Sequence, residues 1–119
     1  MNITNSTANT TITGTSSADS IYNNSNASGV AINAGDGKDT IANYASSVTI
    51  SAGAGDDTVY NHYWAPNVKI DAGEGNDTIH NNSSNNVSIV GGAGNDSINN
   101  TGYYATLGGG TWRRYHYCR

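Results

Sequence analysis

The sequence is poor in the residues that usually build a globular core or a covalent framework. It holds one cysteine, one proline and no phenylalanine in 119 residues. A single cysteine excludes an internal disulfide framework. With so few large apolar side chains, a conventional two-layer core would be thin at this length, which suits one domain at most.

Segments that would direct the chain to a membrane or a secretion pathway are also missing. The N-terminal stretch, MNITNSTANT, contains neither a basic start nor an apolar run, so the chain shows no N-terminal signal peptide. No stretch approaches the roughly 20 apolar residues of a membrane-spanning helix. The sequence therefore predicts no membrane span.

Positive charge is nearly absent from most of the chain. The formal net charge is −4, but all three arginines follow Trp112. Before Trp112, nine acidic residues stand against Lys38 and Lys69, which makes this part −7. Phosphate binding needs clustered lysine and arginine, so the sequence argues against nucleic acid as a partner and favours a cation.

The acidic residues belong to an internal repeat. Four segments share the pattern [A/G]-G-x-G-x-D-[T/S]-[I/V], and their key aspartates follow one another at nearly constant intervals. The segments are Ala34–Ile41, Ala52–Val59, Ala72–Ile79 and Gly91–Ile98. An asparagine comes two positions after each segment, and then an apolar-x-apolar triplet such as Val48-x-Ile50. Weaker copies extend the array to about six units between positions 3 and 107.

Each unit reads as two very short strands, because valine and isoleucine at alternate positions point to one face of a strand. Stacked coils of about 18–20 residues with two strands each form a flattened solenoid that buries one narrow, continuous core. The sequence therefore predicts an all-β fold, a parallel β-roll of about six coils. We assign it to a single domain over residues 1–111, with the best-formed turns in residues 34–98.

The glycine–aspartate turns have the chemistry of a metal site. Glycines allow positive φ and close backbone approach. The aspartates would stack in one column about 4.8 Å apart, where bare carboxylates repel one another. Ca²⁺ accepts about 6–8 oxygen ligands from carboxylates and carbonyls, whereas zinc and copper prefer the histidine or cysteine that these turns lack. The candidate metal-binding residues are Gly35, Gly37, Asp39, Gly53, Gly55, Asp57, Gly73, Gly75, Asp77, Gly92, Gly94 and Asp96.

These turns resemble the G-G-x-G-x-D-x-U-x nonapeptide of the RTX (repeats-in-toxin, hemolysin-type) proteins. Gly91–Asn99 matches it completely, and the other three turns begin with Ala34, Ala52 or Ala72 in place of the first glycine. The resemblance implies a calcium-loaded parallel β-roll, with ions held between successive turns by the aspartate and loop carbonyls. It also implies export from a bacterial cell and folding triggered by extracellular calcium.

The chain departs from the common family pattern in its spacing. In the common form the nonapeptide occupies both edges of the roll, whereas here it occurs once in each coil and occupies one edge. We therefore expect one calcium column with about three sites. The first copy, Gly14–Asp19, lacks the second glycine, and Asp19 is expected to be at best a weak ligand. Asp36, Asp56 and Glu74 occupy variable positions that are either direct ligands or solvated side chains.

Other residues invite structural interpretations. Six asparagines share one register and are interpreted as a ladder that satisfies turn backbone groups: Asn5, Asn23, Asn43, Asn61, Asn81 and Asn100. The histidines share no register, so we expect His62, His80 and His116 to be solvated. The repeat units differ in length only after these asparagines, so one edge of the solenoid is expected to vary. Aromatic residues at this variable edge could pack the turns or form a patch, together with one proline: Tyr44, Tyr63, Trp64, Pro66, Tyr103 and Tyr104.

We predict a calcium-binding and folding module, secreted or extracellular, and not an enzyme. The alternatives are a calcium-dependent adhesion module that binds a glycan or cell surface through the aromatic edge, and an accessory segment of a larger secreted toxin or enzyme. The open ends of a solenoid also allow self-association.

The C-terminal stretch WRRYHYCR breaks the pattern. When the repeat is continued from Ile89 to Leu107 and beyond, positions 112–114 should read Gly, any residue and Asp. A one-base shift of permitted codons turns Trp112-Arg113-Arg114 into Gly-Asp-Asp. We therefore interpret residues 112–119 as an atypical tail, either a calcium repeat read out of frame or a cap on the last coil. Arginine codons other than CGA at these positions would exclude the frameshift.

Overall fold

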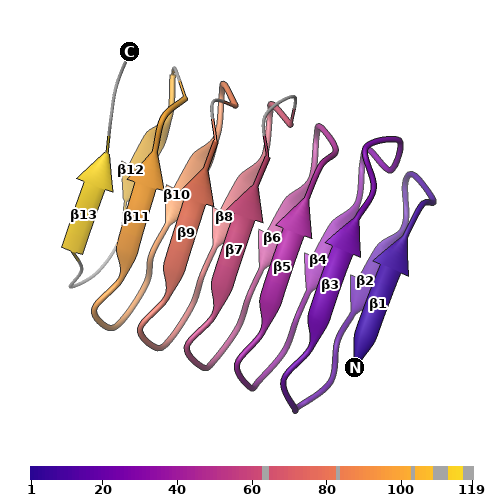
Figure 1. Cartoon of the computed structure of the whole chain (residues 1–119), viewed down its shortest axis with the longest axis horizontal. Coiled ribbons are helices and arrows are strands. Elements are labelled where there is room, and N and C mark those ends of the chain that lie inside the picture. Colours follow the sequence, from indigo (N-terminus) through magenta and orange to yellow (C-terminus); the bar gives the residue numbers. More distant parts are fainter. Residues whose placement is uncertain (63–64, 83, 103, 109–112, 117–119) are drawn as a thin grey trace.

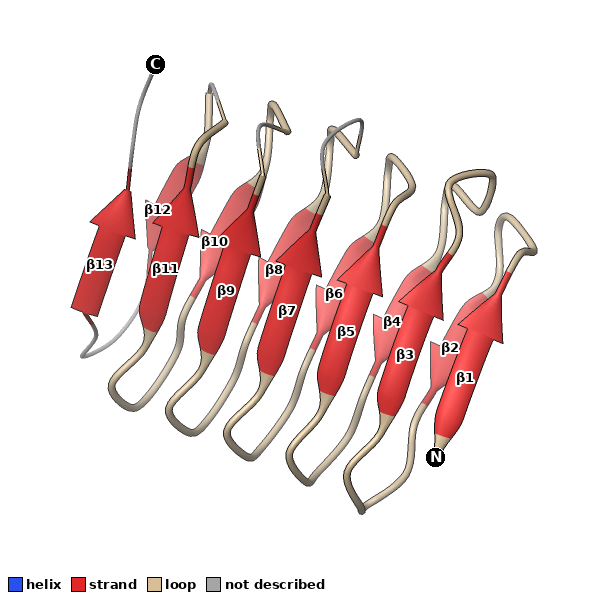
Figure 2. Ribbon diagram, viewed as in Figure 1, coloured by secondary structure: helices blue, strands red, loops and turns tan. Residues whose placement is uncertain are grey.

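The computed structural model describes residues 1–62, 65–82, 84–102, 104–108 and 113–116, and it shows a parallel β-solenoid (Figure 1). The chain runs through one sheet, turns, and returns through a second sheet, so each coil contributes one strand to each. The described residues contain strands and loops and no helix (Figure 2). Accordingly, no helix in them is long and apolar enough to cross a membrane.

The two sheets consist of very short parallel strands. Among the described residues, sheet A contains β1 (Asn2–Asn5), β3 (Ser20–Asn23), β5 (Thr40–Asn43), β7 (Thr58–Asn61), β9 (Thr78–Asn81), β11 (Ser97–Asn100) and β13 (Arg113–His116). In the same part of the chain, sheet B contains β2 (Thr11–Thr13), β4 (Ala31–Asn33), β6 (Thr49–Ser51), β8 (Lys69–Asp71), β10 (Ser88–Val90) and β12 (Thr106–Gly108). This arrangement confirms the predicted all-β parallel solenoid with two short strands in each coil.

The core is a pair of aliphatic columns, one from each sheet. In sheet A, Ile41 lies in register between Ile21 and Val59, and in sheet B, Ile50 lies in register with Ile70. All five are at most 2% exposed. Because neighbouring residues on a strand point to opposite faces, one aliphatic residue per short strand is enough to continue the column. This explains how so few large apolar residues sustain the fold.

The two edges of the solenoid differ, as the sequence predicts. At one edge, a six-residue turn always precedes the next strand of sheet A, from Gly14–Asp19 through to Gly91–Asp96. The opposite edge varies between five and seven residues. The residue before its last position is repeatedly left-handed, for example Ser47 (φ 57°) and Asn67 (φ 60°). The edge of constant length is therefore the one that holds the glycine–aspartate turns.

The tail does not follow the register predicted for it. Continuing the repeat placed Arg114 opposite Asp96, but β13 pairs Arg114 with Ile98 and His116 with Asn100. The prediction was wrong because the connection from β12 to β13 has four residues instead of six. His116 therefore does share a register, that of the asparagine column, at the level of the backbone. Residues 109–112 and 117–119 of the tail lie outside the described residues.

Candidate metal centre

Strands β5, β7, β9 and β11 of sheet A, each with the residue before it, bring three kinds of side chain to the interior. In the third coil, Asp39 directly precedes β5, Ile41 lies within it and Asn43 ends it. The alternation of side chains along a strand turns all three inward, and none of them is exposed. The same order recurs in the next three coils. Sheet A therefore presents a column of aspartates, a column of aliphatic residues and a column of asparagines to the interior.

The turns before the aspartates depend on glycine. Their eight candidate glycines have φ between 82° and 125°: Gly35, Gly37, Gly53, Gly55, Gly73, Gly75, Gly92 and Gly94. At Gly73, a Cβ atom would clash with the carbonyl oxygen of Gly53 in the preceding coil. Glycine alone combines this backbone conformation with such a close approach of two chains. The turns are thus stacked backbone against backbone.

Backbone N–H groups donate hydrogen bonds along the aspartate column, each from one coil to the carboxylate of the next coil. Oδ1 of Asp57 accepts a hydrogen bond from the backbone N–H of Asp39 at 2.8 Å. In the same way, Asp77 accepts from Asp57 at 2.8 Å, and Asp96 accepts from Asp77 at 2.9 Å. The row begins with the N–H of Asp19, which donates to Asp39 at 2.8 Å. Each of these carboxylates therefore joins two neighbouring coils through one of its two oxygens.

The second oxygen of each carboxylate has no partner among the described residues. Oδ2 of Asp39, Asp57, Asp77 and Asp96 is buried and accepts no hydrogen bond. A buried polar atom without a partner costs about 1–3 kcal/mol, and more when it is charged. A bound cation would remove this cost for the four oxygens of the column, and oxygen ligands suit a hard ion such as Ca²⁺.

An ion in this column would draw its ligands from more than one coil. Within the described part of the chain, no three histidine, cysteine, aspartate or glutamate side chains converge on one point. Carboxylates of adjacent coils, supplemented by carbonyl oxygens of the turns, would have to share the ion. The residues present fit a calcium ion on these terms.

Burial shifts the titration of the column. Desolvation raises the pKa of Asp57 to about 6 and that of Asp77 to about 7, from an ordinary value of 3.8. The pKa values of Asp39 and Asp96 are raised for the same reason. The hydrogen bond that each Oδ1 accepts from a backbone N–H lowers the pKa, but by less than desolvation raises it. Without a cation, the middle of the column holds carboxylates that resist ionisation.

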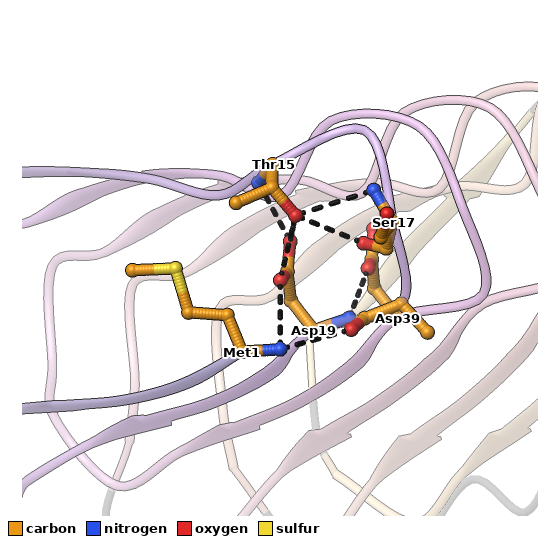
Figure 3. A network of polar contacts seen from close by, with 6 residues as sticks. Met1, Thr15, Ser17, Asp19 and Asp39 are labelled. Carbon is orange, nitrogen blue, oxygen red and sulfur yellow. Dashed lines mark hydrogen bonds and ion pairs between the residues drawn. The ribbon is translucent and has the colours of Figure 1, made fainter.

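The first turn is built differently (Figure 3). Oδ2 of Asp19 accepts a hydrogen bond from the backbone N–H of Thr15 at 2.7 Å, and the hydroxyl of Thr15 donates to Oδ1 at 2.9 Å. The Met1 ammonium lies 3.3 Å from the same Oδ1. The N–H of Thr15 contributes most to lowering the pKa of Asp19. Both oxygens have partners, so this turn has no need of an ion.

The variable acidic positions lie on the outside of the turns. Asp36, Asp56 and Glu74 are exposed. Oδ1 of Asp56 accepts a hydrogen bond from the backbone N–H of Asn76 at 2.8 Å, and Oδ1 of Asn76 accepts one from Asn95 at 2.9 Å. A second row of cross-coil hydrogen bonds thus runs along the surface. Asp56 takes part in that row and does not join the buried column.

We expect Asp56→Asn to leave both stability and calcium binding nearly unchanged. The amide oxygen can still accept from Asn76, and the site is exposed. The free energy of unfolding should change by at most about 0.5 kcal/mol. Thermal unfolding with and without calcium measures both effects. A loss of the calcium response would instead identify Asp56 as a ligand.

The asparagine column forms a ladder, which confirms its structural interpretation. Nδ2 of Asn43 donates to Oδ1 of Asn61 at 2.9 Å, and Nδ2 of Asn61 donates to Oδ1 of Asn81 at 3.0 Å. The same nitrogens also donate to turn carbonyls, that of Ala45 at 2.8 Å and that of Ala65 at 3.1 Å. The ladder runs along the edge of variable length, opposite the aspartates. It ties turns of different lengths to a constant strand end.

Two histidines are half-buried rather than fully solvated, because each stacks on a tyrosine. His62 stacks on Tyr44, with ring centroids 4.0 Å apart and planes 6° apart, and His80 stacks on Tyr60 at 5.1 Å and 6°. Burial lowers the pKa of His62. A signal for these pairs was present in the sequence: Tyr44 and His62 each follow a ladder asparagine, and Tyr60 and His80 each precede one.

The predicted aromatic edge is only partly within the described residues. Tyr63, Trp64 and Tyr103 lie outside them. Tyr104 is 82% exposed, and Tyr44 belongs to the stack with His62. The described aromatic rings therefore mostly pack on one another across coils.

Comparison with known proteins agrees with this geometry. The family model described as RTX calcium-binding nonapeptide repeat (4 copies) matches residues 33–61, 67–88 and 85–99. These ranges include all four glycine-rich turns and cover more than half of the chain. No curated protein and no solved structure matches the chain.

Proposed function

Because the chain belongs to the RTX calcium-binding nonapeptide repeat family, we propose that calcium ions bound along its aspartate column drive the folding of the solenoid. The family and the solenoid fold support calcium binding in general. The proposal adds three points: folding depends on calcium, the aspartate column holds the ion, and the chain acts outside the cell.

The four unpartnered Oδ2 atoms support this proposal most directly. They are buried, aligned from coil to coil and without a hydrogen-bond donor among the described residues. A solenoid that must bury this column without a counter-charge loses stability at neutral pH. The carboxylates of the same column attract a divalent cation strongly.

The twelve candidate residues divide into two roles. Asp39, Asp57, Asp77 and Asp96 would supply carboxylate oxygens, and their Oδ1 hydrogen bonds fix where Oδ2 points. The eight glycines let successive turns stack closely enough for carbonyl oxygens to reach the column. Bound Ca²⁺ would supply the positive charge that lets these carboxylates sit side by side.

Folding and binding are then one equilibrium. The column exists only when the coils are stacked, so an ion binds the folded chain and not the unfolded chain. Such binding stabilises the folded state by about 2.7 kcal/mol when free calcium is 100 times its dissociation constant. For a fold with so thin a core, this is a large part of the total.

Calcium titration of EDTA-stripped protein tests the proposal. We expect far-UV circular dichroism to show a gain of β-structure, or thermal unfolding to shift upward, at calcium levels of about 0.1–1 mM, the range of extracellular calcium modules. Mg²⁺ should have a much smaller effect, because it keeps its waters and demands octahedral geometry. A stripped protein that is fully folded and indifferent to calcium would contradict the proposal.

We propose that the chain acts outside the cell as a binding and folding module and not as an enzyme. The family is typically extracellular, and millimolar calcium is available there. The buried aspartates also serve contacts between coils rather than forming a cleft. We do not extend the proposal to an adhesive aromatic edge, because Tyr44 stacks on His62 and Tyr63, Trp64 and Tyr103 lie outside the described residues.

A further inference from the structure

The four turns are not equivalent in the residue that opens them. Ala34, Ala52 and Ala72 open the first three glycine-rich turns, and none of these alanines is exposed. Gly91 opens the fourth. Unlike the glycines inside the turns, Gly91 is not among the residues with positive φ, so its backbone would accept any side chain. The reason for glycine there lies in the space around it.

Gly91 faces the unpartnered oxygen of its own turn. A Cβ atom at Gly91 would lie 2.7 Å from Oδ2 of Asp96, 3.2 Å from its Cγ and 3.3 Å from its Cβ. Gly14 stands in the same relation to Asp19, where a Cβ atom would lie 2.7 Å from Oδ2. The first residue of a turn therefore lies against the second oxygen of the aspartate that closes it.

The three alanines place a methyl group on that side of the turn. A calcium ion needs about 6–8 oxygens at roughly 2.3–2.6 Å, and a carbon atom beside the ligating oxygen takes the place of one or more of them. A buried methyl group cannot be replaced by water without opening the turn. In the Gly91 turn no methyl group lies on that side, so Oδ2 of Asp96 lies closer to the first residue of its turn than an alanine would allow. Its carboxylate can therefore adjust toward an ion without meeting a methyl group.

We propose that the residue that opens each turn grades calcium affinity along the column, and that the site to which the Gly91–Asp96 turn contributes is the tightest. This inference rests on the proposed function and adds an order to it. Calcium binds first at the site shared by the third and fourth turns, and the sites between the turns opened by Ala34, Ala52 and Ala72 fill at higher concentrations.

Two opposite substitutions in the full chain test the grading, with isothermal titration of CaCl₂ as the measurement. Gly91→Ala should weaken the tightest binding step by roughly 10- to 100-fold, the range seen when a group beside a metal ligand is changed. Ala72→Gly should strengthen a weaker step by a similar factor. Ala45→Gly is the matched control, because it removes an equally buried methyl group at the opposite edge. It should not strengthen calcium binding, because it removes a buried methyl group that lies away from the aspartate column.

The outcomes separate this inference from the proposed function. Ala72→Gly relieves crowding and so remains informative if Gly91→Ala does not fold. If the unsubstituted chain binds calcium, but Gly91→Ala binds as tightly and Ala72→Gly binds no tighter, the grading is overturned and calcium binding stands. If the unsubstituted chain binds no calcium, both are overturned. Equal shifts for Ala72→Gly and Ala45→Gly would assign the effect to general loosening and overturn the grading.

Discussion

Asp77→Asn should stabilise the calcium-free protein and weaken its response to calcium. The side chain of Asp77 is 1% exposed and its Oδ2 has no partner. Asparagine keeps the Oδ1 acceptor for the backbone N–H of Asp57 but carries no charge. Removing one buried, unpaired charge at pH 8 should raise the free energy of unfolding by about 1–3 kcal/mol. With calcium present the sign reverses, because a ligand of the central sites is lost.

The same variant should flatten the pH dependence of the calcium-free protein. The folded-state pKa of Asp77 is raised to about 7 and that of Asp57 to about 6, above the ordinary 3.8. The folded state therefore binds more protons than the unfolded state between about pH 4 and pH 7. Stability from these groups is fully present below about pH 4 and is lost as the pH rises through 6 and 7. Calcium affinity follows the opposite course and falls below about pH 7, because the ion competes with the proton.

Thermal unfolding from pH 5 to pH 8, in EDTA and in saturating calcium, measures both effects. A gain of about 1 kcal/mol corresponds to about 4 °C for a domain of this size. Asp56→Asn is the matched control, since Asp56 is the exposed neighbour of the buried column. A calcium-free Asp77→Asn protein that is less stable at pH 8 would show that the column needs the carboxylate for reasons other than metal binding.

The spacing of a few residue types was enough to predict the fold. Isoleucine and valine at alternate positions indicated short strands, and their recurrence once in every repeat unit indicated one coil per repeat. The register of Ile41 with Val59 and of Asn43 with Asn61 follows directly from that recurrence. The inward position of Asp39 follows as well, because it lies two positions before Ile41 on the same face.

Other features depend on distances that no spacing encodes. The sequence could place the aspartates in a column but could not tell that Oδ1 is taken by a backbone N–H while Oδ2 stays free. It also could not tell that Asp19 is satisfied by Thr15. The register predicted for the tail was wrong because the residue types do not show that the connection before β13 is shorter. The Tyr44–His62 stack joins residues of adjacent coils that each follow a ladder asparagine, but this shared position does not show whether the two rings touch.

Asn61→Ala should lower the free energy of unfolding more than any other change at the edge of variable length, opposite the glycine–aspartate turns. Asn61 is fully buried. It accepts from Nδ2 of Asn43 and donates to Oδ1 of Asn81 and to the carbonyl of Ala65. Alanine removes all three hydrogen bonds and lets no water in. At about 1–2 kcal/mol for each buried group that loses its partner, the loss is on the order of 3–6 kcal/mol. That is a large fraction of the roughly 5–15 kcal/mol that stabilises a typical domain.

Thermal unfolding in saturating calcium isolates this loss from any effect on the ion, because Asn61 lies at the far end of β7 from Asp57. Asn82→Ala is the control: its side chain is exposed one position beyond the ladder, and it should shift the midpoint by no more than a surface substitution does. Similar shifts for the two variants would mean that the ladder adds little beyond the aliphatic columns. A much larger shift for Asn61→Ala would mean that the asparagine ladder holds the coils in register at the edge of variable length. The side-chain amides of the ladder need no ion for this, since each donates directly to the next coil.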